Sequence, residues 1–504
     1  MNNWLAHQAQ ERPDAPALIA GKHCLSWQEL AECARRRAAV LADHGLRPGH
    51  VVAVEAESRL ESVCWMHAVF WLGATLFPLP PRLPAAVLDQ RLARLAPNAL
   101  VVGDPGQAFA SVVSSQTVVV SLTAPAESTE PDPPPSCIDG QDILTILWTS
   151  GSTGAARAVP LTMANHVAST RAIAERLGIT AKDRWLLCLP LEHIGGLAIL
   201  VRAMITGASV DLHEHFDPDR VRADLATQAI TLASMVPTML ARLIEHSPNP
   251  CQSNLRALLI GGAPATPQLL HDARTAGLPV VPTWGMTETC SQLATLDPAE
   301  AARVDFLASP GLVGPPLTGV ELRIEPDPSC PDTADNVGRL LVRGPMVFGG
   351  YLKSGIAAGE QAEDWFDTGD VGRIDAQGRV IMAHRASDLI ISGGVNINAR
   401  EVESILLQSP WVDDVAVLGL PHPTWGEQVV AVVALGEHDH HLDDIPATLT
   451  RWCREHMEPP QMPKRWQVLT RLPRNAAGKC RRDELAALFA NQPESPAVLP
   501  AGKH

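Results

Sequence analysis

The chain has 504 residues, which is too long for one compact core and predicts at least two domains. Its net charge of −15, with 46% hydrophobic and 19% charged residues, indicates a globular protein and excludes a nucleic-acid or anionic-membrane partner. No apolar stretch could span a bilayer, the first residues lack a signal-peptide pattern, and the ten cysteines show no metal or disulfide spacing, so we expect a cytoplasmic protein.

The first hundred residues alternate between helix and strand patterns. A helix is predicted over residues 26–46, opened by Ser26, with Glu29 completing a capping box and Gly45 as its end. It is followed by a strand at 51–55, a helix at 60–72 and a strand at 99–102. This alternation predicts a largely parallel sheet.

A Pro-rich linker at 124–135 leads to the most informative stretch. The apolar strand that begins at Ile143 ends in the small-residue run Thr149 to Gly154, and a helical pattern resumes near Asn165. Strand, small-residue loop and helix is an arrangement that binds phosphates, because glycines let the backbone approach an anion. The Walker pattern is absent, and an ordinary connection is the simpler alternative.

Further βα repeats follow, with strands predicted to begin near residues 184, 208, 230, 255 and 280. Gly, His, Thr or Glu residues stand at the carboxyl ends of most of these strands, among them His193, Gly262, Thr287 and Glu288. Ligands bind at that edge of open α/β sheets. We therefore expect these motifs to share one site.

Each candidate residue also has a structural interpretation. Thr287 and Glu288 can cap a helix or bind phosphate and Mg²⁺. Asp370 can be a turn residue or a ribose ligand, and His193 can be a satisfied buried histidine or a ligand. Lys479 can be a solvated loop residue, although a compact ammonium in a chain with only six lysines suits a reacting phosphate or carboxylate.

The predicted fold class is α/β. Residues 1–386 form a large domain of βα-layered sheets, in which short strands from about 312 build a small barrel-like subdomain. Residues 387–490 form a mobile α+β domain, and the Pro/Ala-rich tail at 491–504 is expected to be disordered.

The motifs taken together resemble the adenylate-forming superfamily of acyl-CoA synthetases, nonribosomal adenylation domains and luciferases. The resemblance covers nearly the whole chain and rests on five motifs in the family's order, which are 149–154, 285–289, 368–370, 385–388 and 475–479. It implies that a carboxylate reacts with Mg·ATP to give acyl-AMP and pyrophosphate, after which a thiol such as coenzyme A displaces AMP.

The resemblance also implies a role for each matching residue. The phosphates are held by Thr149, Ser150, Gly151, Ser152, Thr153, Gly154 and Arg157, with Thr287 on a phosphate and Glu288 on Mg²⁺. Gly262, Ala263 and Pro264 line the adenine, Asp370 and Arg385 bind the ribose, and Lys479 bridges the carboxylate and the α-phosphate. The small domain rotates between half-reactions about a hinge near Ser387.

Within the superfamily, residues 185–193, 213–217, 285–292 and 387–394 resemble the o-succinylbenzoate–CoA ligases of menaquinone synthesis. Such a substrate has an aromatic ring and two carboxylates, so one carboxylate needs a cation. Arg202, nine residues after His193, is our candidate, and a surface helix position is its structural alternative. His193, Trp284 and Gly285 are the other residues expected to contact the acid.

Three departures from the family pattern leave alternatives open. The phosphate loop ends in Ala156-Arg157-Ala158 where Pro-Lys-Gly is usual, His384 stands for the usual Gly, and Val395 for the usual Glu. The alternatives are a ligase that loads a carrier-protein phosphopantetheine, a paralogue for another aryl or fatty acid, and an inactive binding protein. A homodimer is also compatible with the sequence.

Overall fold

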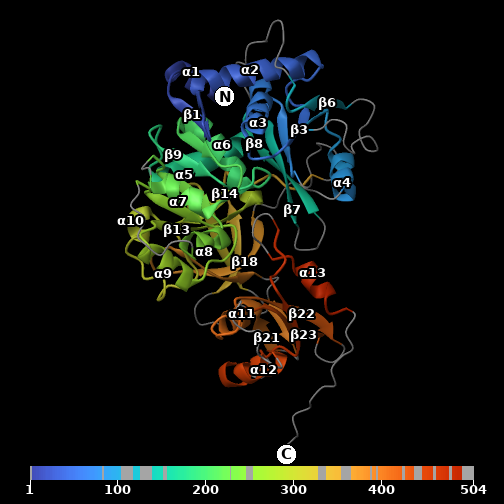
Figure 1. Cartoon of the computed structure of the whole chain (residues 1–504), viewed down its shortest axis with the longest axis vertical. Helices are drawn as coiled ribbons and strands as arrows, with labels where there is room; N and C mark the ends of the chain where they lie inside the picture. Colours follow the sequence, from blue (N-terminus) through green and yellow to red (C-terminus); the bar gives the residue numbers. More distant parts are fainter. Residues whose placement is uncertain are drawn as a thin grey trace, which may run out of the picture. The chain divides into compact units, whose positions relative to one another are not determined.

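The computed structural model describes residues 3–81, 85–103, 117–124, 139–150, 156–226, 229–245, 254–326, 337–352, 365–385, 389–392, 395–422, 426–435, 445–457, 461–475 and 480–490. Its contacts separate two compact units (Figure 1). The first contains Met1–Arg323, Leu341–Phe366 and Ile374–Ile381, and the second contains Ile324–Leu340, Asp367–Arg373 and Met382–His504.

An eight-stranded sheet forms one layer of the first unit, in the order β14-β13-β12-β11-β9-β10-β1-β2. Its six inner strands are parallel, and the edge strands β2 and β14 are antiparallel to their neighbours. The strands are β1 (Pro16–Ala20), β2 (His23–Ser26), β9 (Arg184–Leu187), β10 (Ser209–Leu212), β11 (Leu232–Met235), β12 (Ala257–Ile260), β13 (Val280–Met286) and β14 (Ser291–Thr295).

A second sheet of the same unit has six strands in the order β6-β5-β3-β4-β7-β8. These are β3 (Val51–Glu55), β4 (Thr75–Leu79), β5 (Ala99–Val102), β6 (Val118–Ser121), β7 (Ile143–Ser150) and β8 (Ala156–Thr162). All pair in parallel except β8, which is antiparallel to β7. The strands β3, β4 and β5 are almost wholly apolar and buried, as expected for a sheet covered on both faces.

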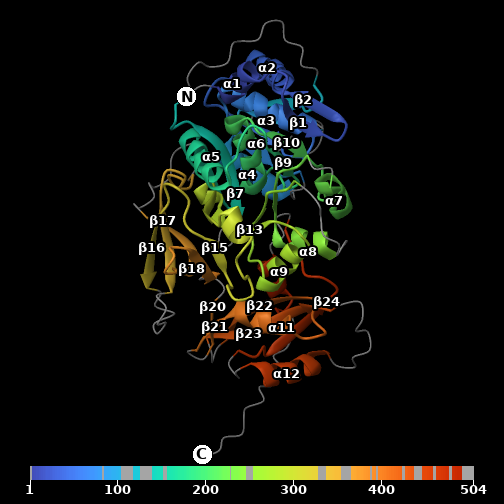
Figure 2. The same ribbon diagram turned by 90° about the vertical axis from the view of Figure 1, so that its left-hand side faces the viewer.

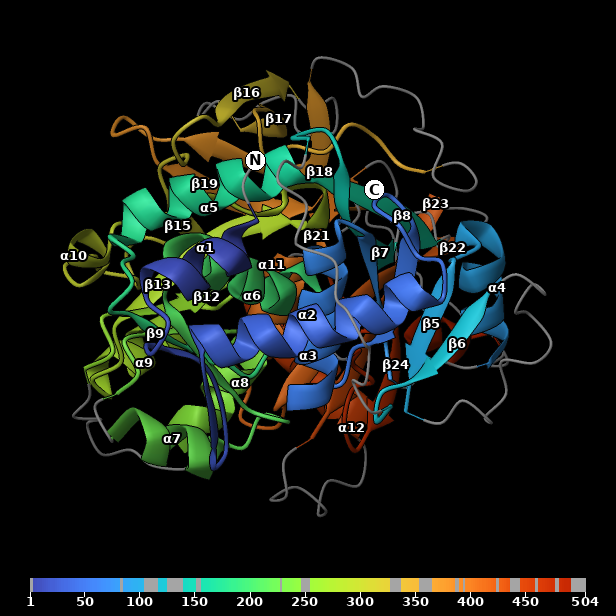
Figure 3. The ribbon, with the colours of Figure 1, turned by 90° about the horizontal axis from the view of Figure 1, so that it is seen from above.

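Helices cover both sheets. The first four are α1 (Trp4–Glu11), α2 (Trp27–Asp43), α3 (Leu60–Leu72) and α4 (Ala85–Leu95), and the others of this unit are α5 (Met163–Leu177), α6 (Ile194–Thr206), α7 (Pro218–Ala226), α8 (Pro237–Glu245), α9 (Pro267–Thr275) and α10 (Pro298–Ala301). Figure 2 shows α7, α8 and α9 following one another along one side, and Figure 3 shows α2 lying across α3. The helix α3 is buried on nearly every side and packs on β3 and β4.

The short strands after residue 311 form a five-stranded sheet in the order β15-β19-β18-β17-β16. They are β15 (Leu312–Gly314), β16 (Glu321–Pro326), β17 (Gly338–Arg343), β18 (Phe366–Ile374) and β19 (Val380–Arg385).

The C-terminal part of the second unit is a sheet with helices on its two faces. Its strands are β20 (Leu389–Ser392), β21 (Val395–Asn398), β22 (Asp414–His422), β23 (Gly426–Ala434) and β24 (Arg465–Leu469). Alternate residues of β22 and β23 enter two separate cores, because successive strand side chains point to opposite faces. One core includes α11 (Ala399–Leu406) and α12 (Ile445–His456), and the other includes α13 (Arg482–Ala487) (Figure 1).

The α/β class and most elements are as the sequence predicts. The capping box at Ser26 and Glu29 is present, and the strand at 51–55 and the helix at 60–72 have the predicted bounds. Several strands were not predicted, among them β1, β2, β4, β6, β8, β14, β21 and β24. No helix in the described ranges is both long enough and apolar enough to cross a membrane.

Candidate active site

The strand that leads into the predicted phosphate loop returns as a hairpin. The expectation of strand, loop and helix is wrong here, because β8 intervenes and pairs antiparallel with β7. The register places Thr149 directly opposite Arg157. The helix α5 begins only after β8, with its own capping box of Thr162 and Asn165. No helix N-terminus in the described part of the chain follows the loop directly, and Arg157 is the cationic residue that β8 places beside the end of β7.

The tip of this hairpin, Gly151, Ser152, Thr153 and Gly154, lies outside the described residues, as do the hinge candidate Ser387 and Lys479. Ser150 ends β7, and Arg385 ends β19 in the chain's second unit. The roles of these residues stay predictions.

Glu288 is the centre of the described contacts. It is 7% exposed and lies in a single 3₁₀ turn, Thr287–Thr289, directly after β13. Its Oε1 atom accepts hydrogen bonds from the Tyr351 hydroxyl at 2.8 Å and from Thr149 Oγ1 at 3.4 Å. The hydrogen bond from Thr149 thus joins β7 of the six-stranded sheet to the turn that follows β13 of the eight-stranded sheet. Thr287 is the first residue of the turn, and Met286 holds the cap position, so the interpretation of Thr287 as a helix cap is wrong.

The backbone after Glu288 is strained. Cys290 and Ser291 have φ angles of 51° and 94°, which residues with a Cβ rarely adopt. Such conformations cost about 1–3 kcal/mol each and persist only where the surroundings hold them. Here Ser169 Oγ donates to the Cys290 carbonyl at 2.7 Å, and the Phe348 amide donates to the Glu288 carbonyl at 2.8 Å. The backbone of the turn that carries Glu288 is therefore held by hydrogen bonds from two other segments.

Tyr351 is a contact residue of Glu288 that was not expected from the sequence. Burial, and then the adjacent Glu288 carboxylate, raise the pKa of Tyr351, so its hydroxyl stays protonated and donates. The guanidinium carbon of Arg157 lies 4.0 Å from the centroid of the Tyr351 ring. A compositional signal was present, because Tyr351 is the only tyrosine in the chain and follows Gly349-Gly350.

The donor set fits Mg²⁺ that arrives with a nucleotide. Among the described residues, no group of three or more His, Cys, Asp or Glu side chains could hold a metal ion by itself. Glu288 offers one carboxylate beside hydroxyl groups, and Mg²⁺ typically uses one or two carboxylates together with substrate phosphates.

Arg202 is a buried cation. It lies in α6 with 2% exposure, so the alternative of a surface helix position is wrong. Its Nη2 donates to Gln292 Oε1 at 2.5 Å and to Ser169 Oγ at 3.4 Å, and its guanidinium carbon is 5.7 Å from the Trp185 ring centroid. Its Nε has no hydrogen-bond partner in the described part of the chain, and burial lowers the pKa of Arg202 to about 10.

His193 caps α6 with extended backbone angles, φ −109° and ψ 148°. Its carbonyl accepts from the amides of Gly196 and Leu197 at 3.1 and 3.0 Å, while its half-buried side chain does not cap the helix. A Cβ on Gly196 would lie 2.3 Å from the Pro190 carbonyl oxygen. Gly196 therefore serves close packing at the start of α6.

The predicted adenine and acid segments follow β12 and end β13. Gly262 has a φ angle of +79° at the end of β12, and it and Pro264 are exposed while Ala263 is half-buried. Trp284 is 7% exposed, and a Cβ on Gly285 would lie 1.8 Å from the Ser291 carbonyl oxygen. Gly285 thus allows the close approach of β13 and β14.

Asp370 belongs to the second unit. It is 3% exposed and lies inside β18, so the turn interpretation is wrong. Its amide donates to Thr368 Oγ1 at 3.1 Å, and that hydroxyl donates to the Leu340 carbonyl at 2.7 Å. The backbone at Asp370 is thus fixed inside the sheet, and its role as a ribose ligand stays a prediction.

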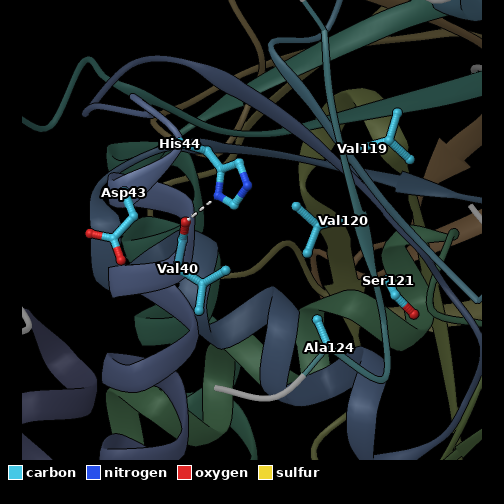
Figure 4. A pocket seen from close by; sticks show the side chains of 7 residues that line it. All are labelled: Val40, Asp43, His44, Val119, Val120, Ser121 and Ala124. Carbon is cyan, nitrogen blue, oxygen red and sulfur yellow. Dashed lines mark hydrogen bonds between the residues drawn. The ribbon is translucent and has the colours of Figure 1, made fainter. Parts of the chain in front are cut away.

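A surface pocket in the first unit contains none of the candidate residues. It lies between the end of α2 and β6, where His44 Nδ1 donates to the Val40 carbonyl at 2.8 Å (Figure 4). Its lining consists of Val40, Asp43, His44, Val119, Val120, Ser121 and Ala124. No Lys or Arg of the described residues lines this pocket, so its lining gives no reason to place the phosphates of a nucleotide there.

Two family models match the chain. The AMP-binding enzyme model covers residues 5–352, and the AMP-binding enzyme C-terminal domain model covers residues 401–479. The 2-succinylbenzoate–CoA ligase of Bacillus licheniformis is 36% identical over 96% of this chain and 99% of its own length. The enzyme of the same name from Listeria monocytogenes serotype 4b is 32% identical, covering 96% of this chain and 99% of its own.

Solved structures give the same result. The o-succinylbenzoate coenzyme A synthetase of Bacillus subtilis, in complex with its acyl-adenylate intermediate, matches with a TM-score of 0.85 and 34% identity over 96% of this chain and 98% of that chain. ATP-bound MatB from Rhodopseudomonas palustris also has a TM-score of 0.85, at 27% identity over 97% and 99% of the two chains. The predicted family and fold class are confirmed. The chain belongs to the AMP-binding enzyme family, the adenylate-forming enzymes whose motifs it carries in order.

Proposed function

We propose that this chain is an ATP-dependent, AMP-forming acid–CoA ligase whose acid is o-succinylbenzoate. The observation that supports the choice of acid is Arg202, a buried guanidinium with no carboxylate within 4.0 Å among the described residues. A buried cation without a counter-ion is expensive, so a substrate carboxylate is a physically reasonable partner. The relatives reported above are named for the same acid.

In the first half-reaction, one carboxylate oxygen of the acid attacks the α-phosphorus of ATP, and pyrophosphate leaves. Negative charge builds up on the phosphate oxygens, so catalysis depends on positioned positive groups. Mg²⁺ held by Glu288 would neutralise part of this charge. Arg157 supplies the fixed charge of the phosphate hairpin, and Lys479 is proposed to contact the α-phosphate and the attacking carboxylate.

The nucleotide is proposed to lie against Gly262, Ala263 and Pro264, with its ribose on Asp370 and Arg385. His193, Trp284 and Gly285 are proposed to contact the aromatic acid, and Arg202 its second carboxylate. Gln292 connects Arg202 to the Glu288 turn. It accepts a hydrogen bond from Arg202, and it lies in β14, the strand that follows this turn.

In the second half-reaction, a thiol sulfur attacks the acyl carbon of acyl-AMP, and AMP leaves. Coenzyme A is the proposed thiol, since the relatives are named CoA ligases and the match covers nearly their whole length. Transfer to a carrier-protein phosphopantetheine would need a separate partner and is the alternative outcome.

ATP–pyrophosphate exchange with a panel of acids tests the proposal. The panel contains o-succinylbenzoate, benzoate, 4-oxo-4-phenylbutyrate and octanoate. We expect exchange to be fastest with o-succinylbenzoate, because only this acid supplies both an aromatic ring and a second carboxylate for Arg202. Faster exchange with a monocarboxylate would contradict the choice of acid, and no exchange with any acid would contradict the enzyme class.

A further inference from the structure

The chain's single tyrosine lies in a set of contacts that surround the proposed metal ligand. Besides its hydrogen bond to Glu288, the Tyr351 ring packs edge-to-face on Phe348, with centroids 4.8 Å apart and planes at 72°. Phe348 in turn donates its amide to the Glu288 carbonyl. Residues 348–351 thus hold Glu288 by its backbone and by its side chain.

Arg157 is a further residue in contact with the Tyr351 ring. Its guanidinium lies over the Tyr351 ring at 4.0 Å, and it stands opposite Thr149, whose hydroxyl donates to the same Glu288 oxygen as Tyr351. The four residues Thr149, Arg157, Glu288 and Tyr351 all belong to the first unit. They form a continuous loop of contacts, in which each residue restrains the next.

Arg157 makes no ion pair within this set, although the set contains the Glu288 carboxylate. Its Nε is buried without a hydrogen-bond partner, and the structure gives it no carboxylate within 4.0 Å in the described ranges. It is held by stacking rather than by an ion pair. A planar guanidinium can stack on an aromatic ring, whereas an ammonium is a point charge on a flexible stem. The position where the family usually has Lys is therefore occupied here by a residue whose placement depends on its aromatic neighbour.

We propose that Tyr351 is a positioning residue for adenylate formation, which fixes the Arg157 guanidinium by stacking and the Glu288 carboxylate by its hydroxyl. This inference rests on the proposed function, since it assigns Arg157 to the phosphates and Glu288 to Mg²⁺. It implies that Arg157→Lys, which restores the residue common in the family, is harmful in this chain.

The activity test uses ATP–pyrophosphate exchange with the preferred acid. Arg157→Lys and Tyr351→Phe should each lower kcat/KM for Mg·ATP about tenfold, because one removes the stack on Arg157 and the other the hydrogen bond to Glu288 through which Tyr351 is proposed to act. The KM for the acid should change less than twofold. A general loss of structure would instead raise the KM for the acid together with the loss of kcat/KM for Mg·ATP. Arg91→Lys is the matched control, because Arg91 lies 5.3 Å from the Trp148 ring centroid and has no proposed role at the site; its exchange rate should be unchanged.

A double-mutant comparison separates stacking from charge. In a Tyr351→Leu background no ring is left to stack on, so Arg157→Lys should have little further effect. Equal effects of Arg157→Lys in the two backgrounds would overturn the proposal. So would an Arg157→Lys variant that is as active as the parent chain.

A readout without the acid distinguishes failure of this inference from failure of the proposed function. Protein labelled with ¹³C-tyrosine gives the ring signal of a single residue. That signal should shift in Arg157→Lys and in Glu288→Gln, should stay in place in Arg91→Lys, and should move when Mg·ATP is added. A signal that Arg157→Lys leaves unchanged would show that the stack is absent in solution and would overturn the inference, whichever acid the enzyme uses.

Discussion

The guanidinium of Arg202 in α6 donates to the side-chain oxygen of Gln292 in β14 at 2.5 Å. The amide of Gln292 is neutral, so this contact orients the cation without neutralising it. The Cys290 thiol nearby stays protonated, because burial raises the pKa of Cys290 to about 12. A positive charge is thus fixed and shielded from solvent beside Gln292, which lies three residues after the Thr287–Thr289 turn, and this explains how a second carboxylate could be selected.

Arg202→Leu should remove the preference for a dicarboxylate. An interaction of this kind is worth about 2–5 kcal/mol, so kcat/KM for o-succinylbenzoate should fall at least about 30-fold. The value for a monocarboxylate of similar shape should be nearly unchanged. Arg256→Leu, which breaks the ion pair with Asp183 at 2.9 Å, is the control for loss of a partly buried arginine. An unchanged preference for the dicarboxylate in Arg202→Leu would contradict the proposal that Arg202 binds the second carboxylate.

Glu288→Gln should lower ATP–pyrophosphate exchange by about 10²–10³-fold, the effect of removing one group that stabilises transition-state charge. The amide keeps the shape of the side chain and an acceptor for Tyr351, so the thermal unfolding temperature should change little. Raising the Mg²⁺ concentration should restore part of the rate. Glu321→Gln, an exposed carboxylate paired with Arg343, is the control and should behave as the parent chain does. A fully active Glu288→Gln would rule out the metal-ligand role.

Lys479→Ala should abolish formation of acyl-AMP but still convert supplied acyl-AMP to the thioester, because the lysine is proposed to act only in the first half-reaction, on the α-phosphate and the attacking carboxylate. Single-turnover assays of the two half-reactions measure this directly. Lys182→Ala provides a lysine control in the first unit. If both half-reactions fell equally, the proposed role of Lys479 would be untenable.

Stability of the first unit should fall as the pH drops below about 6.5. Burial lowers the pKa of His67 to about 4 despite its hydrogen bond to the Val63 carbonyl. Between these values the unfolded chain binds a proton that the folded chain does not, so stability rises with pH. From pH 6.5 to pH 5 this amounts to about 2 kcal/mol. The free energy of unfolding in urea should differ less between pH 7 and pH 5 for His67→Met than for the parent chain. Equal differences would contradict the attribution of this pH dependence to His67.

Strong local signals predicted the fold well. The apolar residues of α3 and the β-branched strand at 51–55 specify their elements locally, and both elements have the predicted bounds. The capping box at Ser26 fixes the start of α2, which ends at Asp43 and not at the predicted residue 46. The order of small residues, acids and basic residues at strand ends predicted the family, since phosphate chemistry constrains which residues can stand there.

Pairings between distant segments could not be predicted. The strand β8 contains Pro160 and is an edge strand, so its pattern is weak and only its partner β7 defines it. Glu288 meets Tyr351 across 63 positions, and Arg202 meets Gln292 across 90, so no local period records either contact. The burial of Arg202 was equally hidden, because an arginine in an apolar helix is compatible with a surface position and with a buried site.

Mass spectrometry of the products formed from ATP, Mg²⁺ and o-succinylbenzoate, with and without coenzyme A, tests the central claim most directly. The account predicts o-succinylbenzoyl-AMP and pyrophosphate without coenzyme A, and the coenzyme A thioester with AMP when it is present. An acyl-adenylate that coenzyme A leaves unchanged would contradict the ligase assignment and favour a carrier protein as acceptor. No adenylate at all would contradict the proposed acid.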